Sequence, residues 1–82
     1  MTISTQVCKK AREDLAKARQ RRDHRLTELN DAEKRLTGLE AAQPPDPQKI
    51  ADQKIHVENA RTLWIEAKEE VKSLQEKVDE VC

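Results

Sequence analysis

The sequence predicts an all-α protein: a two-helix antiparallel coiled-coil hairpin, with dimerisation into a four-helix bundle as a further option. Three observations support this. The 82 residues are 39% charged and 35% apolar, a balance typical of long helices and coiled coils. The prolines form one central cluster, and a seven-residue apolar repeat runs along both sides of it. We expect residues 1–82 to form a single helical hairpin.

The composition excludes several other classes. With no Phe or Tyr and one Trp, the chain lacks the aromatic residues that strands of a sandwich or barrel need. One Gly is too few for the loops of an α/β enzyme. The longest apolar run is the triplet 63–65, whereas a membrane span needs about 18 apolar residues. No secretory signal is visible, because Met1–Val7 has no apolar region.

A helix-breaking segment near the middle divides the chain into two helices. We call it the tip, and its residues favour a turn: Pro44, Pro45, Asp46 and Pro47. The first two prolines cannot lie inside a helix, whereas Asp46-Pro47 fits an N-cap followed by the first helical residue. The sequence therefore predicts a helix over about 5–42, capped by Ser4 or Thr5, a turn over 43–47, and a helix over about 47–81.

Both predicted helices carry heptad seams. The second has apolar residues at nine of ten a and d positions, whereas Arg22 and Arg25 interrupt the first. Antiparallel pairing places residues whose numbers sum to 89 in one layer, from Leu39 with Ile50 to Cys8 with Val81. Residues 1–43 carry ten basic and seven acidic residues and residues 44–82 carry six and nine, so the halves attract.

The e and g positions beside the seam predict ion pairs between the helices. The expected pairs are Asp14 with Lys77, Arg21 with Glu70 and Glu33 with Lys54. Arg19 opposite Lys68 is a mismatch of like charge. Because exposed pairs contribute only about 0–1 kcal/mol each, they indicate register rather than stability.

Cys8 and Cys82 are almost equally distant from the turn, so the hairpin brings them to one end. The favoured interpretation is a disulfide that closes the open end, stabilises by roughly 4 kcal/mol and implies an oxidising environment. The alternative is two unrelated thiols in a reducing compartment. No Cys or His spacing fits a zinc site, so we expect no metal.

The middle of the rod holds the most informative residues. Trp64 lies in the seam opposite Arg25, with Arg22 one layer away, which predicts a cation–π contact and a role in register. Two helices cannot bury all of the apolar residues nearby. They form a candidate interaction belt: Leu26, Ile55, Leu63, Trp64 and Ile65. Scattered surface aliphatic residues are the alternative.

The densest basic run extends from Lys9 to Arg25. It suggests contact with an anionic surface, or else a solvated face that pairs with acidic residues of the other helix. No aromatic residue interleaves the run, so nucleic acid is not an expected partner. His24 and His56 lie far apart and form no catalytic set, so we expect no enzyme activity and no cofactor.

The layout of two long helices around a Pro-rich turn, with Asp46-Pro47-Gln48 before the second helix, resembles several unrelated families, among them type III secretion needle subunits and BAR-domain tips. The resemblance assigns the chain to none of them.

The predicted function is a non-enzymatic coiled-coil module for protein interaction or assembly, with a protein partner or a second copy of itself. The alternative is a hairpin that binds a receptor or an anionic surface through tip residues 43–48 or the arginine cluster 17–25. Membrane insertion is not expected, because neither helix has a wide apolar face.

Overall fold

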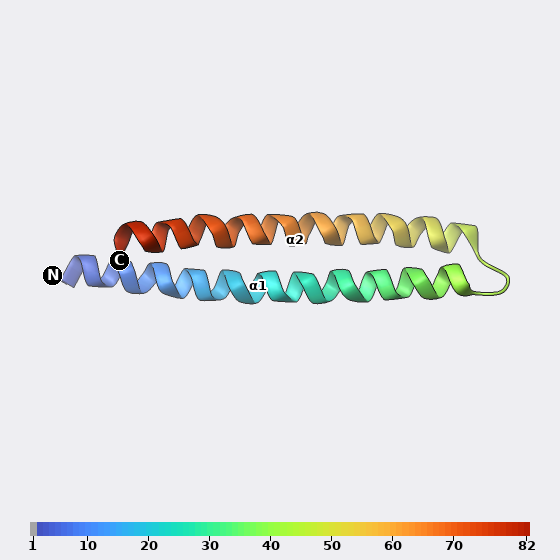
Figure 1. Cartoon of the computed structure of the whole chain (residues 1–82), viewed down its shortest axis with the longest axis horizontal. Coiled ribbons are helices and arrows are strands. Elements are labelled where there is room, and N and C mark those ends of the chain that lie inside the picture. Colours follow the sequence, from blue (N-terminus) through green and yellow to red (C-terminus); the bar gives the residue numbers. More distant parts are fainter. Residues whose placement is uncertain (1) are drawn as a thin grey trace.

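The protein is a hairpin of two long helices that lie side by side in opposite directions (Figure 1). The computed structural model describes residues 2–82, with side chains from residue 5 onward. Helix α1 spans Thr2–Ala41 and helix α2 spans Pro47–Val81, and the described chain contains no strand. The rod measures 67 × 13 × 13 Å. The predicted all-α helical hairpin is confirmed.

The turn begins and ends where the prolines require. Helix α1 ends at Ala41, and the peptide bond between Gln43 and Pro44 is cis. The Asp46 carboxylate accepts hydrogen bonds from the backbone N–H groups of Gln48, at 3.1 Å, and Lys49, at 3.2 Å. These bonds satisfy two donors that have no partner within the first turn of α2, so Asp46 is the predicted N-cap.

The start of α1 differs from the expectation. The helix begins at Thr2, so the backbone at Ser4 and Thr5 is helical and neither residue is the N-cap. Ser and Thr favour caps, but they retain the backbone N–H and do not end a helix as proline does. No proline lies between Thr2 and Ala41, and the helix runs through both hydroxyl residues.

The core follows the predicted seam. All nine buried residues occupy a or d positions, and the remaining seam positions are half-buried. The buried residues are Ala11, Leu15, Ala18, Leu29, Ala32, Gln53, Val57, Ala60 and Ala67. One cluster contains Leu29, Ala32, Val57 and Ala60, as expected for layers in which the two residue numbers sum to 89. Five of the buried residues are alanines, so the helices bury little apolar volume for their length.

Gln53 is the one buried polar side chain among residues 5–82. Its Nε2 donates to the carbonyl oxygen of Ala32 across the seam at 3.0 Å. The bond satisfies a buried amide that would otherwise destabilise the core, and it ties one position of α2 to one position of α1. Gln53 therefore fixes register in the tip half of the rod.

Candidate functional site: the middle of the rod

The apolar surface of the rod is concentrated near its middle. Among residues 5–82, five large apolar side chains are exposed, and four of them belong to the predicted belt. Their exposed fractions are 37% for Leu26, 60% for Ile55, 40% for Leu63 and 42% for Ile65. Trp64 is half-buried and packs against the core cluster. We call these five residues the mid-rod belt.

The belt is divided between two flanks of the rod. On one flank Arg19 contacts Gln75 at 3.0 Å and Glu33 contacts Arg61 at 3.5 Å. Leu26 lies one heptad from both Arg19 and Glu33, so it shares their flank, which we call the Leu26 flank. Ile65 is four residues after Arg61 and therefore borders that flank too.

The opposite flank carries Leu63. There Arg21 of α1 pairs with Glu70 of α2, as predicted, and Leu63 lies one heptad before Glu70. We call this the Leu63 flank. Ile55 lies eight residues before Leu63, about 12 Å along the axis. The structure therefore does not join the five belt residues into one continuous patch.

The cation over the Trp64 ring is Lys68, whose Nζ lies 3.9 Å from the ring centroid. The sequence predicted Arg25 in this role, and the structure differs. Arg25 instead donates to Glu28 at 3.0 Å, and Arg22 donates to Asp23 at 3.1 Å. A partner on the same helix is held nearby by the backbone itself, so these local contacts compete well with contacts across the seam.

Two of the predicted ion pairs have other partners. Across the seam Glu33 meets Arg61 rather than Lys54, and within α1 Asp14 accepts a hydrogen bond from Lys10 at 2.9 Å. That hydrogen bond lowers the pKa of Asp14, and the nearby charges of Lys10, Lys17 and Lys77 lower it further. The same hydrogen bond raises the pKa of Lys10.

A groove rich in cations lies on the Leu26 flank, beside the Arg19–Lys68 mismatch. Its lining residues come from both helices: Arg19, Arg22, Lys68, Val71, Lys72, Gln75 and Glu76. Four are cations and one is a carboxylate. Arg22 pairs with Asp23, but Arg19 uses the neutral Gln75 as its acceptor, so that contact does not neutralise the charge of Arg19.

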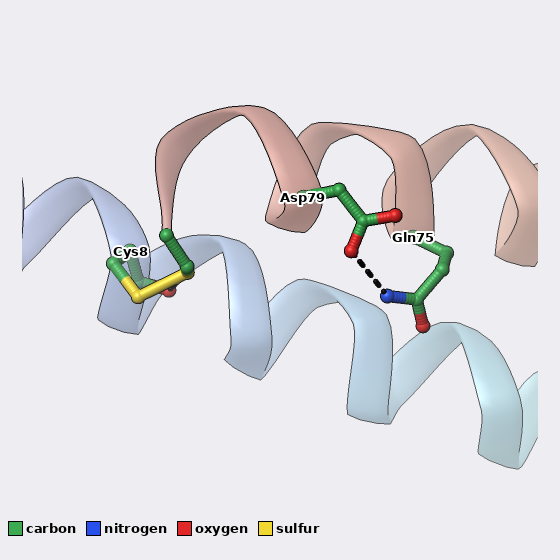
Figure 2. The surroundings of a disulfide bond; sticks show 4 residues. Cys8, Gln75 and Asp79 are labelled. Carbon is green, nitrogen blue, oxygen red and sulfur yellow. Dashed lines mark hydrogen bonds between the residues drawn. A yellow bond between two sulfur atoms is a disulfide. The ribbon is translucent and has the colours of Figure 1, made fainter.

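The open end of the rod is closed by the predicted disulfide between Cys8 and Cys82, whose Cα atoms are 5.1 Å apart (Figure 2). It joins α1 to the residue that follows α2, across 74 positions of sequence. In the last turns of α2 beside it, Gln75 donates to Asp79 at 3.1 Å (Figure 2). The predicted disulfide is confirmed, and neither cysteine is a free thiol.

The tip residues 43–47 are all exposed. His24 contacts Glu28 at 3.0 Å and lies on α1, whereas His56 lies on α2. Within the described part of the chain, no three His, Cys, Asp or Glu residues gather in a way that could hold a metal ion. No helix in residues 2–82 is both long and apolar enough to cross a membrane.

Comparison of the chain with protein-family models, with curated proteins and with solved structures found no match.

Proposed function

We propose that the protein is a non-enzymatic coiled-coil assembly module that associates with itself through the mid-rod belt. The observation that carries this proposal is the clustering of exposed apolar side chains near the middle of an otherwise charged rod. Exposed apolar side chains at similar heights of a helical rod are typical of an interface with other helices.

The belt residues lie at similar heights along the rod. Leu26 and Leu63 have numbers that sum to 89 and thus share one level. Ile65 is two residues away from it, about 3 Å, and Ile55 about 12 Å, along a rod 67 Å long. Covering these side chains removes apolar surface from water, at about 25 cal/mol per Å².

The rod suits an assembly role because its surface is held in place at both ends. The Asp46 cap and the prolines define the tip, and the disulfide closes the open end. A partner therefore meets a preorganised surface and loses little conformational entropy in ordering it.

Sedimentation equilibrium of the oxidised protein, up to about 1 mM, tests the proposal. We expect reversible association that at least one of the changes Leu26→Glu and Leu63→Glu, which lie on opposite flanks, weakens by tenfold or more, because it places a charge in the flank that docks. Thr27→Glu is the matched control: it adds the same charge beside Leu26 but on the outer face of α1, and should leave association unchanged. A strict monomer over the whole concentration range would refute self-assembly.

The cationic groove favours a second candidate function: binding of an anionic surface through the arginine cluster 17–25. Four cations line the groove against one carboxylate. Retention on heparin at low salt, which falls as salt is added and is lost in Arg19→Gln with Lys72→Gln, would support it. No retention at low salt would exclude it.

A further inference from the structure

We infer that the belt's partner is a second copy of this chain, docked end for end so that the two Leu26 flanks face each other. This inference rests on the proposed self-assembly and specifies its geometry. It follows from two stripes of residues, one on each helix. Along the rod both stripes present the same types of side chain in the same order.

Each stripe repeats at heptad spacing. On α1 it runs Arg19, Leu26, Glu33, and on α2 it runs Lys72, Ile65, Glu58 when read in the same spatial direction. Both stripes therefore pass from a cation near the open end, through an exposed aliphatic residue, to a carboxylate nearer the tip. Each step is seven residues, about 10.5 Å.

End-for-end docking superimposes the stripes with opposite charges in contact. A two-fold axis perpendicular to the rod and in the plane of the interface, midway between the levels of Leu26 and Ile65, places each stripe on the same stripe of the other copy, running in the opposite direction. Leu26 then meets Leu26 and Arg19 meets Glu33, whereas Ile65 meets Ile65 and Lys72 meets Glu58. Symmetry makes each charged contact twice, as in any isologous dimer.

The parallel arrangement is disfavoured by the same residues. With both open ends together, the α1 stripe lies on the α2 stripe. Leu26 then meets Ile65, but Arg19 meets Lys72 and Glu33 meets Glu58. Like charges in contact cost free energy, so the charge order selects the end-for-end arrangement.

The second copy also accounts for the cationic groove. Within one chain Arg19 has only the neutral Gln75 as its acceptor and faces the like charge of Lys68. In the dimer Glu33 of the second copy supplies the negative charge that faces Arg19, and Glu58 supplies the one that faces Lys72. The Leu63 flank offers no comparable match, because its α1 stripe, residues 21, 28 and 35, is entirely charged and Arg21 is already paired.

The interface is small at its apolar centre, since each copy contributes chiefly Leu26, Ile65 and the edge of Trp64. We therefore expect a weak dimer with a dissociation constant on the order of micromolar to millimolar. The charged stripes determine its orientation more than its affinity.

Charge reversal with rescue tests the inference by sedimentation equilibrium at low salt. Glu58→Lys should weaken dimerisation by tenfold or more, and Lys72→Glu combined with Glu58→Lys should restore it. Within one chain these residues lie about 21 Å apart along the rod, so rescue reports the contact between copies. Glu69→Lys is the matched control on the outer face of α2 and should leave the dimer unchanged. Far-UV circular dichroism verifies that each variant is folded.

Two results would overturn the inference in different ways. A dimer that Leu63→Glu abolishes but Glu58→Lys leaves intact would refute this geometry and preserve the proposed self-assembly, whereas a monomer at every concentration would refute both. A spin label at Gln43, placed through an unnatural amino acid, reports orientation independently. We expect the two labels about 50 Å apart; adjacent labels would show parallel docking and overturn the inference.

Discussion

Replacing both Cys8 and Cys82 by serine removes the covalent link at the open end of the hairpin. We expect a large loss of stability, because the rest of the fold is weakly packed. Five of its eight buried apolar residues are alanines, and two helices alone bury a small core.

The size of the effect follows from the length of chain that the disulfide closes. For a separation of 74 residues, the chain-entropy model gives about 4.5 kcal/mol at 25 °C. This is comparable with the entire stability of many domains, about 5–15 kcal/mol. At about 4–8 °C per kcal/mol for a chain of this size, the melting temperature should fall by roughly 20–35 °C.

Urea unfolding followed by far-UV circular dichroism measures the change. The oxidised protein is compared with the double variant Cys8→Ser, Cys82→Ser, and with the oxidised protein after reduction, which should match the variant. Hydrogen exchange adds a local measurement. Amides near Ala11 and Ala18, beside the lost link, should lose protection before those of Leu29 and Ala32.

An unfolding midpoint that stays within error of the oxidised protein, in a sample whose thiols are shown to be free, would refute the reasoning. It would mean that the seam alone supplies the stability of the hairpin. Loss of protection that begins at the tip would also contradict it, because the link constrains the opposite end.

Four further predictions concern single sites. Gln53→Ala should destabilise by about 1–3 kcal/mol, since it removes a buried hydrogen bond across the seam. Asp46→Ala should cost about 1 kcal/mol through loss of the α2 cap. Gly38→Ala should stabilise by about 1 kcal/mol, because the site is helical and an added Cβ meets nothing within 4 Å. The pKa of Asp14, measured by NMR, should lie below its ordinary value and rise in Lys10→Gln.

The controls for these sites share the residue type but lack the contact. Gln20→Ala, exposed on the outer face of α1, should leave the unfolding midpoint unchanged, in contrast to Gln53→Ala. Asp52→Ala should cost less than Asp46→Ala, since Asp52 lies beyond the first turn of α2. Equal effects within either pair would contradict the assigned contact.

The sign of the Asp14 effect on stability follows from the direction of its pKa shift. Because the folded state lowers this pKa, the contribution of Asp14 is present above its unfolded pKa and is lost as pH falls through the folded one. Lys10 behaves in the opposite sense: its raised pKa gives a contribution that is present below its unfolded pKa and is lost as pH rises through the folded one.

The sequence by itself determined the hairpin, the seam and the disulfide. Prolines that cannot continue a helix, an aspartate that caps the next one, and a seven-residue apolar repeat are local or periodic features, and they dictate backbone geometry directly. Once each residue of one helix is paired with the residue whose number brings the sum to 89, Cys8 and Cys82 come close together, because the two cysteines are almost equally distant from the turn.

Only the tertiary structure decided how the long polar side chains pair and how the belt divides. Lys68 covers Trp64 in place of Arg25, Arg61 replaces Lys54 as the partner of Glu33, and Leu26 and Leu63 lie on opposite flanks. Long charged side chains in water have several partners within reach at nearly equal free energy, because exposed ion pairs are weak. Their choice depends on the positions of atoms from both helices, whereas a buried seam admits one register because a shift would expose its apolar residues.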